Sequence, residues 1–560
     1  MFQLISVFIL VLLQQTRCLP VDLVDEGQEL TLDVLHINDI HSYFEETNQY
    51  SARCRDPSPQ CYGGIARVFT KQKEIRERSP ATTIFLNAGD FYQGTLWYSK
   101  FKYEPMIEFG NHLNYTAMGL GNHDFDDKIE GLTPFSDMIS FPLLASNINS
   151  DESDLVEGKH YYKSTVVEVN GTKVGIIGYI TQSTRYNFPD GEVAFTDEIA
   201  SVRREAEKLD AEGVKVIIAL GHSGYETDIV LAKQVPLLDL VVGGHSHTFL
   251  YTPENEDDKP IDYIQGAYPT YVTSAEGNKV IPVVQAKAYN KYLGHLTLNF
   301  DVNGELKLPL ESEGVSFAKP YLMDGTVAPD EETLSMMVKW QDRLSDYKKT
   351  LGYSEVLLKE KGDSEESNIG NAITDSMIAV YEDASIAMVN NGGIRSSIPV
   401  GNITGEDIYY VLPFENTVDK LVLLGSELRK AIEVAASKLS YADHDKYPGF
   451  GLQLSGAQID MVVTEENNAG NRIQSFKVKN TDGGFDDLKE DQPYTLAIGS
   501  FLGPVGKQKY LRGIFDEVEI IEYTPGVKTD YEAMAEWVET NSPINAKIEG
   551  RFSVNYATKL

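Results

Sequence analysis

Cysteines, basic residues and long apolar stretches are all scarce in this sequence of 560 residues. It has three cysteines, and its 49 lysines and arginines face 84 aspartates and glutamates, so the formal net charge is −35. A surface of that sign repels nucleic acids and anionic membranes, and we expect neither as a partner. It also repels small anions, so an anion site here needs bound metal ions or a local cluster of Arg and Lys. No internal apolar run approaches the roughly 20 residues that a membrane-spanning helix needs.

The first 18 residues are predicted to be a secretory signal peptide. Leu4–Leu13 is an apolar run broken only by Ser6, which is too short to span a bilayer but typical of the core of a signal peptide. The last ten residues, Arg551–Leu560, are polar and offer no hydrophobic tail for a lipid anchor. We therefore expect a secreted protein without a membrane anchor.

Two cysteines, Cys54 and Cys61, remain once a signal peptide containing Cys18 is removed. An even number in an oxidising compartment predicts one local disulfide, with two free thiols as the alternative. Three Asn-X-Thr sequons predict N-glycosylation, which also fits secretion. Their asparagines are Asn114, Asn170 and Asn402.

Short apolar segments alternate with segments of helical spacing in the first half of the chain. The helical spacing covers residues 64–79, 104–113 and 199–212. This alternation predicts an α/β fold whose site lies beyond the carboxyl ends of the strands. Five of the predicted strands end in loops that carry Asp, Asn or His, namely Asn38–His41, Asn87–Asp90, Asn122–His123, Gly221–His222 and Gly243–His247.

The length and the 42% hydrophobic content predict a folded chain of two to four domains. Asp330 suits the cap of a helix that runs from Glu331 to about residue 349. We interpret this helix as the link between two domains. The expected division is a first domain over residues 24–328, a link over 329–350 and a second domain over 351–553.

The loop that contains Asn122, His123 and Asp126 gathers three functional groups within five residues. The amide oxygen of Asn122 can bind a metal, and the imidazole of His123 can face a developing negative charge. The carboxylate of Asp126 can orient that imidazole. Few structural loops need this combination, so the loop indicates a catalytic site if other loops supply more ligands.

The five loops together supply a set of metal ligands. Two divalent ions about 3.5–4 Å apart need a bridging carboxylate and several further His, Asp or Asn ligands. A structural role is the alternative for any single Gly-His after a strand, but five loops agree on a shared site. Such a set suits zinc, manganese or iron. Its members are Asp39, His41, Asp90, Asn122, His222, His245 and His247, with Asp90 as the natural bridge.

These loops resemble the five motifs of the metallophosphoesterases, and more closely those of the 5′-nucleotidase/apyrase family, in particular the secreted salivary apyrases of arthropods. The resemblance extends to Tyr62–Arg67 beside Cys61. It implies an N-terminal metallophosphoesterase α/β sandwich that holds two metal ions. It also implies a long helix that joins this sandwich to a C-terminal 5′-nucleotidase α+β domain, which binds the nucleoside.

The resemblance also assigns roles to the ligands. Asp39, His41 and His247 would hold one metal ion. Asn122, His222 and His245 would hold the other, with Asp90 between them. The two divalent ions are expected to be zinc, with manganese, calcium or magnesium as alternatives. His123, protonated and oriented by Asp126, would stabilise the charge that the phosphoryl group develops in the transition state. His247 stands where the membrane-anchored vertebrate 5′-nucleotidases have Asn, but it agrees with the general metallophosphoesterase pattern.

Two segments of the second domain resemble the family's substrate-binding residues. Asn390–Arg395 resembles its phosphate loop, in which Arg395 would offer a bidentate guanidinium. The alternative is a plain turn with a surface arginine. Phe414 and Phe501 match the two aromatic residues that stack on the base, and core packing is the alternative for each. Asn390, Arg395, Phe414 and Phe501 are therefore the expected substrate-binding residues.

Two other segments depart from the family. Lys361–Glu366 stands where the family has an Arg-bearing loop, and no arginine occurs between Arg343 and Arg395. A lysine replaces such a phosphate-binding arginine only in part, because it is a point charge rather than a fork. Leu502–Lys507 replaces the segment whose Asp holds the ribose. We expect relaxed sugar recognition and an altered phosphate site.

The function implied by the resemblance is that of a secreted, metal-dependent nucleotide phosphohydrolase of the apyrase type. It would remove terminal phosphates from ATP and ADP, and so inhibit platelet aggregation by removing ADP. One alternative is a 5′-nucleotidase that hydrolyses AMP to adenosine and phosphate. An alternative of another class is a low-activity protein that binds nucleotides or a host protein. We expect a monomer or a weak dimer.

Overall fold

The computed structural model describes most of the chain between residues 29 and 556. The described residues are 29–54, 60–79, 82–150, 153–188, 191–277, 279–360, 365–439, 450–464, 470–504, 513–515 and 517–556. The expected signal peptide at residues 1–18 lies outside them, and so do Lys361 and Lys507.

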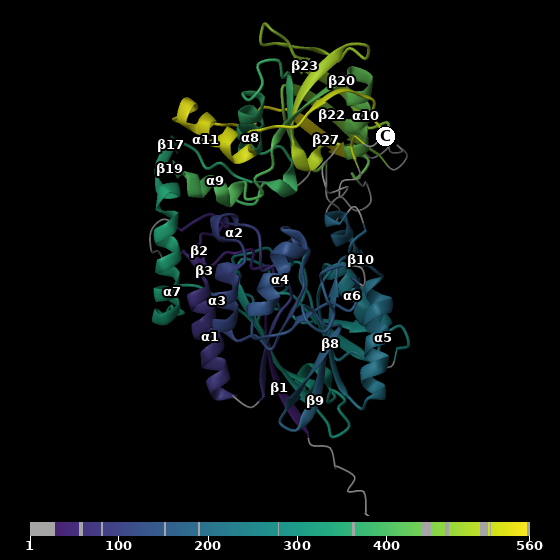
Figure 1. Cartoon of the computed structure of the whole chain (residues 1–560). Helices are drawn as coiled ribbons and strands as arrows, with labels where there is room; N and C mark the ends of the chain where they lie inside the picture. The colour runs from purple at the N-terminus through teal and green to yellow at the C-terminus, as the bar shows by residue number, and fades with distance from the viewer. Residues whose placement is uncertain are drawn as a thin grey trace, which may run out of the picture.

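Two six-stranded sheets stack face to face in the first half of the chain (Figure 1). Their facing side chains form one apolar core, to which Val34 and Leu86 contribute from one sheet and Ile176 and Ile218 from the other. The first sheet has the order β16 (Val315–Leu322), β15 (Tyr292–Phe300), β1 (Leu30–Ile37), β4 (Thr83–Asn87), β5 (Ala117–Gly119) and β6 (Leu143–Leu144). The second has the order β13 (Thr270–Thr273), β14 (Val280–Val284), β12 (Leu240–Val242), β11 (Val216–His222), β9 (Thr172–Ile180) and β8 (Ser164–Val169).

Strand β1 illustrates why the predicted apolar runs form central strands. It pairs with β15 on one side and β4 on the other, and every one of its residues except Thr31 is buried. A strand covered on both faces has this nearly continuous apolar sequence. Because β1, β4, β5 and β6 run parallel, the loops that follow them leave from one edge of the sheet.

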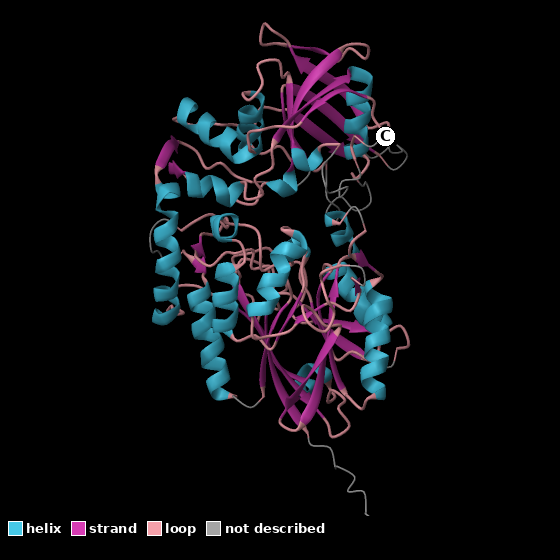
Figure 2. Ribbon diagram, in the orientation of Figure 1, coloured by secondary structure: helices cyan, strands magenta, loops and turns pink. Residues whose placement is uncertain are grey.

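Helices cover the outer faces of both sheets (Figure 2). In α1, Ile65, Val68 and Ile75 form the buried stripe that helical spacing predicts. The first sheet is covered by α1 (Ile65–Arg78), α2 (Leu96–Phe101), α3 (Glu104–Leu113) and α4 (Lys128–Met138). The second is covered by α5 (Glu198–Ala211) and α6 (Tyr225–Gln234). Short strands complete this part: β2 (Glu46–Thr47), β3 (Tyr62–Gly63), β7 (Ile148–Asn149) and β10 (Ala194–Phe195).

The predicted helix after residue 330 is shorter than expected. Helix α7 spans Glu331–Gln341, and the Asp330 side chain caps it by accepting a hydrogen bond from the backbone N–H of Thr333. The chain then continues as a 3₁₀ helix over Asp342–Lys348, a tightening that is common at the carboxyl ends of helices. Trp340 and Leu344 pack into the core of the first half of the chain.

In the described part of the second half of the chain, a five-stranded and a four-stranded sheet are accompanied by helices (Figure 1). The five-stranded sheet has the order β21 (Leu452–Ser455), β18 (Ile386–Asn390), β25 (Pro493–Gly499), β20 (Val418–Leu424) and β26 (Ile520–Thr524). The four-stranded sheet has the order β24 (Phe485–Asp487), β23 (Ile473–Lys479), β22 (Ala457–Val463) and β27 (Phe552–Tyr556). The helices are α8 (Asn368–Ile378), α9 (Gly405–Val411), α10 (Gly425–Ala436) and α11 (Asp530–Asn541), and β17 (Thr350–Ser354) pairs with β19 (Gly401–Thr404).

Helix α9 and the loop after it face the first half of the chain (Figure 1). The guanidinium of Arg53 lies 2.5 Å from the carboxylate of Glu406, and the ammonium of Lys100 lies 3.2 Å from that of Glu415. Glu406 is buried, so its ion pair with Arg53 fixes α9 against the first sheet's loops.

The structure confirms the predicted disulfide between Cys54 and Cys61, whose Cα atoms are 5.9 Å apart. The asparagines of all three sequons, Asn114, Asn170 and Asn402, are exposed, so each is accessible to glycosylation. Across the described ranges, no helix is both long enough and apolar enough to cross a bilayer.

Candidate metal centre

Every predicted ligand lies at the carboxyl end of a strand or just beyond it. Asp39 and His41 follow β1, Asp90 follows β4 and Asn122 follows β5. His222 is the last residue of β11, and the loop after β12 carries His245 and His247. Five ligands have a positive backbone φ, which residues other than glycine rarely adopt. Such strain clusters at functional sites. They are Asp39 (52°), His41 (51°), Asp90 (53°), His245 (77°) and His247 (50°).

Asp39, His41 and His247 form the first group of ligands, and one ligand atom from each lies within 4.8 Å of the others. The Nε2 atoms of His41 and His247 are 3.0 Å apart, and His247 Nε2 is 3.2 Å from Asp39 Oδ1. The structure therefore brings together the three residues that the resemblance assigns to one metal ion.

Asp90, His222 and His245 form the second group, with the same spacing between their ligand atoms. His222 Nε2 lies 2.9 Å from Asp90 Oδ2, which is also 3.6 Å from Nε2 of His41 in the first group. Asp90 thus lies between the two groups, where a carboxylate can bridge two ions.

Two of the four histidines are oriented by their second ring nitrogen. His41 Nδ1 lies 2.7 Å from the carbonyl oxygen of Gln93, and His222 Nδ1 lies 2.8 Å from that of Ala88. When Nδ1 donates to a carbonyl, Nε2 carries the lone pair that binds a metal, and the ring cannot turn away.

The polar atoms of the centre fit two divalent ions. Asn122 Oδ1 is buried and has no hydrogen-bond partner, and neither has His222 Nε2, although Asp90 is near it. Buried polar atoms left without a partner are costly unless something binds them. Gly121 leaves room for the carboxylate of Asp90, because a Cβ at this position would lie 2.2 Å from Asp90 Oδ1. Four imidazoles, two carboxylates and an amide oxygen form a donor set for a transition-type divalent metal.

The electrostatics of the centre favour the metal-binding forms of Asp39, Asp90 and His245, but not that of His222. Burial raises the pKa of Asp39, but the charges of His247 and His222 outweigh it, so the pKa lies below its ordinary value. Burial and the charges of His222 and His123 act on Asp90 in the same way, with the same net direction of its pKa. Burial and the charge of His222 lower the pKa of His245 to about 4. Ionised carboxylates and neutral imidazoles are the forms that bind metal. At His222, burial lowers the pKa, but the charges of Asp90 and Asp39 outweigh it and raise the pKa to about 10, so this imidazole must release a proton when a metal ion binds.

His123 and Asp126 form a pair at the rim of the centre. His123 Nδ1 lies 2.9 Å from Asp126 Oδ2, and the backbone N–H of His123 donates to Asp90 Oδ1 at 2.9 Å. Burial lowers the pKa of His123, but the charges of Asp126 and Asp90 outweigh it, so the pKa is raised. The imidazole therefore carries its positive charge at higher pH than an isolated histidine.

The predicted substrate residues of the second half divide into two pairs. The Phe414 ring lies 5.6 Å from the His123 ring, and the Arg395 guanidinium lies 5.8 Å from the Phe414 ring. Arg395 and Phe414 thus face the metal centre. Asn390 ends β18 just before the glycine turn of the Arg395 loop. Phe501 packs on the core of its own domain, and the structure records no contact between the Phe414 and Phe501 rings.

Sequence reasoning missed several residues that support the centre. Asp124 is buried and accepts backbone hydrogen bonds from Gly121 at 2.8 Å and Phe91 at 2.9 Å, so it joins two ligand loops. The feature of the sequence that could have identified Asp124 is its position next to His123. Tyr289 stacks on Tyr43 at 4.2 Å and lies 5.3 Å from the His247 ring. Nothing in the sequence marks Tyr289, because it follows its nearest ligand by 42 positions.

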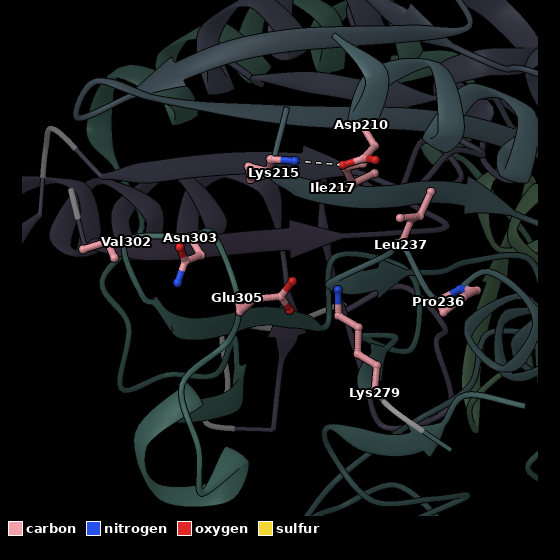
Figure 3. Close-up of a pocket in the computed structure, with 9 residues that line it drawn as sticks. All are labelled: Asp210, Lys215, Ile217, Pro236, Leu237, Lys279, Val302, Asn303 and Glu305. Carbon is pink, nitrogen blue, oxygen red and sulfur yellow. Dashed lines mark hydrogen bonds and ion pairs between the residues drawn. The ribbon is translucent and has the colours of Figure 1, made fainter. Parts of the chain in front are cut away.

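A cavity of about 620 Å³ lies at the opposite ends of the strands (Figure 3). Lys215 precedes β11 and forms an ion pair with Asp210 at 3.1 Å, whereas His222 ends the same strand. The cavity is therefore separate from the metal centre by about the length of β11. It is lined by Asp210, Lys215, Ile217, Pro236, Leu237, Lys279, Val302, Asn303 and Glu305.

Comparisons with known proteins agree on both halves of the chain. A family model of calcineurin-like phosphoesterases matches residues 32–249, and a model of the 5′-nucleotidase C-terminal domain matches residues 350–510. An apyrase of Tabanus yao is 35% identical over 575 residues, which cover 98% of this chain and 99% of the relative. Protein 5NUC of Lutzomyia longipalpis is 34% identical over 582 residues, covering 98% and 97%.

A vertebrate protein and a solved structure extend the comparison. The human 5′-nucleotidase is 36% identical over 543 residues, covering 93% of this chain and 90% of its own. The crystal structure of a 5′-nucleotidase precursor from Thermus thermophilus matches with a TM-score of 0.81 at 30% identity. It covers 94% of this chain and 99% of that one.

Proposed function

The chain belongs to the 5′-nucleotidase family of metallophosphoesterases, and on this premise we propose that it is a metal-dependent hydrolase of nucleotides of the apyrase type. The observation that carries the proposal is the pair of ligand groups, with Asp90 of one group 3.6 Å from His41 of the other. A cationic imidazole at His123 and a guanidinium at Arg395 lie beside them. This arrangement concentrates positive charge where an otherwise strongly acidic protein would repel a phosphate.

The metal ions supply the part of the chemistry that side chains cannot. Two divalent ions bound by the two groups would provide a nucleophilic water at neutral pH and would neutralise the phosphoryl oxygens. Zinc is the ion we propose first. Asp39, Asp90 and the four histidines would hold these ions, and the carbonyl groups of Gln93 and Ala88 orient two of the histidines for this role.

His123 donates a hydrogen bond to the phosphoryl group in this proposal. Its Nδ1 is occupied by Asp126, so Nε2 is the atom available to a substrate. A charged donor that is already oriented stabilises the negative charge of the transition state without reorganisation. Phosphoryl transfer depends chiefly on such positioning and electrostatic stabilisation.

Arg395 and Phe414 bind the rest of the nucleotide. The guanidinium offers two parallel N–H donors to a phosphate, and the Phe414 ring offers a face on which a base can stack. Asn390 and Phe501 are assigned to the same site by resemblance. Both rings belong to the second half of the chain, and a base bound between them would keep them apart, so the lack of contact between the two rings here is compatible with stacking on both faces of the base.

The preference for ATP and ADP over AMP rests on two observations. The first is the 35% identity to an apyrase over nearly the whole chain. The second is the altered sequence around Glu365 and Leu502, which removes two contacts that the family makes to nucleotides. Secretion and removal of extracellular ADP, with inhibition of platelet aggregation, follow as the proposed biological role. A 5′-nucleotidase that acts on AMP is the second candidate, favoured by the identity to the human enzyme.

Phosphate release from ATP, ADP and AMP, with and without EDTA, tests the proposal. We expect release from ATP and ADP that EDTA abolishes and added zinc or manganese restores. Release from AMP alone would support the second candidate. If protein that contains both metal ions releases phosphate from none of the three nucleotides, the result would support a role in binding nucleotides or a protein.

A variant of His123 tests the mechanism separately from the substrate. His123→Ala should lower kcat by about 10²–10³-fold, the usual loss on removal of a transition-state donor, with unchanged metal content. His160→Ala is the matched control, because that histidine pairs with Asp137 far from the ligand loops and should leave kcat unchanged. Full activity of the His123 variant would refute the role assigned to the imidazole.

A further inference from the structure

Glu415, the residue directly after Phe414, has a strained backbone. Its φ is 51°, in the left-handed region that costs free energy for any residue with a side chain. Such a conformation persists only where the surrounding structure imposes it. The direction in which Phe414 points therefore depends on whatever holds Glu415.

The contacts that hold Glu415 come from both halves of the chain. Its Oε1 lies 3.2 Å from the ammonium of Lys100 in α2 and accepts a hydrogen bond of 2.5 Å from the hydroxyl of Tyr409 in α9. The same ammonium lies 4.8 Å from the centre of the Tyr409 ring and 5.1 Å from that of Tyr347. Lys100 is only about a quarter exposed, so its charge is directed to this group of partners rather than to solvent.

Helix α2 also binds the residue on the other side of Phe414. The hydroxyl of Ser99 donates a hydrogen bond of 3.3 Å to the carbonyl oxygen of Pro413. Two consecutive residues of α2, Ser99 and Lys100, thus contact the two neighbours of Phe414. A ring fixed at both flanking residues has little freedom to leave the metal centre.

Helix α2 is itself joined to the metal-binding loops. Its cap residue, Thr95, donates to the carbonyl oxygen of Ser42 at 2.9 Å, and the backbone N–H of Thr95 donates to the Ser42 hydroxyl at 3.1 Å. Ser42 follows the ligand His41 in the chain. A continuous set of contacts therefore runs from His41 through α2 to the loop that carries Phe414.

We propose that Lys100 is a positioning residue: through Glu415 it holds the Phe414 ring over the metal centre, where that ring binds the nucleoside end of the substrate. The proposal rests on the role given to Phe414 in the proposed function. Lys100 does not touch the reacting phosphate in this proposal. Its removal should therefore affect substrates that carry a base and spare those that carry none.

Lys100→Met tests this, because methionine keeps most of the apolar stem and removes the charge. We expect KM for ADP to rise about tenfold, the loss that corresponds to one misplaced aromatic contact. For p-nitrophenyl phosphate, which has no base or ribose, kcat/KM should stay within about twofold. Lys100→Arg should restore most of the lost ADP affinity.

A double variant tests whether Lys100 acts through Glu415. Glycine adopts positive φ without strain. Glu415→Gly therefore removes the backbone strain that the contact with Lys100 offsets, and it also removes the carboxylate with which Lys100 pairs. In that background, Lys100→Met should change KM for ADP less than twofold. A full additional tenfold loss would show that Lys100 does not act through Glu415 and would overturn the proposal.

The control is Lys339→Met in α7. Lys339 also combines an ion pair, with Glu108 at 2.5 Å, and a ring contact, with Trp340 at 5.6 Å, but it lies away from the Phe414 loop. Lys339→Met should leave KM for ADP and kcat/KM for p-nitrophenyl phosphate unchanged. Equal losses on ADP and p-nitrophenyl phosphate in Lys100→Met, or no loss on ADP, would refute the positioning role.

The role of Phe414 needs its own variant. If Phe414→Ala leaves KM for ADP unchanged, the proposed function of that ring fails, and with it the premise of this inference. If Phe414→Ala raises KM for ADP while Lys100→Met does not, only the inference about Lys100 fails. Circular dichroism melting of each variant should match the wild type.

Discussion

Asp228 should make the stability of the metal-free protein depend on pH. This carboxyl group of α6 is buried and accepts hydrogen bonds from the Tyr179 hydroxyl at 2.7 Å and from Gln285 Nε2 at 2.9 Å. Gln285 in turn donates to the carbonyl oxygen of Gly244 at 3.0 Å, in the loop that carries His245. A change at Asp228 therefore reaches the ligand loop through Gln285.

The direction and size of the effect follow from the pKa of this group. Burial raises the pKa of Asp228 to about 7, although hydrogen bonds from Tyr179 and Gln285 oppose the shift. Between its ordinary value of 3.8 and about 7, the folded protein binds a proton that the unfolded chain has released. Stability is then lost as the pH rises through this window, by roughly 4 kcal/mol in total.

Asp228→Asn removes the ionisation and with it this loss. The substitution has its own cost of about 1–2 kcal/mol, because the new amide group opposes the donor of Gln285. Below pH 5 the variant should melt at a lower temperature than the wild type. Above pH 7 it should melt at a higher temperature, by several degrees, so the two curves of melting temperature against pH cross.

Thermal unfolding in EDTA between pH 4.5 and 8.5 measures this crossing, and EDTA prevents bound metal from adding its own stabilisation. Asp210→Asn is the control, because Asp210 is exposed and its partner is Lys215. Its curve should parallel that of the wild type. A variant at Asp228 that melts below the wild type at every pH would refute a pKa raised by burial.

Three further predictions follow from the centre and the disulfide. Asp90→Asn should lose bound metal, measured by atomic emission, and should lose phosphate release in parallel, because Asp90 lies between both ligand groups. Asp126→Asn should lower kcat by about 10–100-fold with unchanged metal content, since His123 loses the group that orients and charges it; metal loss would contradict this. Replacing Cys54 and Cys61 by serine should cost about 2 kcal/mol of stability because the closed loop is short, and an unchanged melting temperature would contradict it.

The candidate ligands could be predicted from the sequence because each one is local to a strand end. A parallel sheet brings the carboxyl ends of its strands to one edge, so Asp39, Asp90 and Asn122 approach one another without any knowledge of tertiary contacts. The grouping of His247 with Asp39 needed more than this rule. It was implied by the family resemblance, and the structure places those residues together.

Contacts between distant segments could not be identified in this way. Glu366 stands in the segment that departs from the family, and from the sequence alone it counted only as part of a lost phosphate loop. In the structure it is buried and accepts hydrogen bonds from the backbone N–H groups of Glu549, Gly550 and Arg551. These partners lie more than 180 positions away, and backbone donors leave no trace in side-chain patterns.

We expect substrate choice to depend on Arg395 rather than on Glu366. The carboxylate of Glu366 is held within the second half of the chain by three backbone donors and by Asn371 at 2.6 Å. Arg395 then supplies the guanidinium that faces the metal centre from the second half of the chain. One fork can bind one phosphate group bidentately, whereas metal ions held by the two ligand groups would bind the phosphate that leaves. A site built from these two elements holds the reacting phosphate in place. It constrains less strongly how many phosphates lie between that phosphate and the ribose. On the proposed function, we therefore expect an enzyme that accepts both ATP and ADP rather than one confined to a single nucleotide.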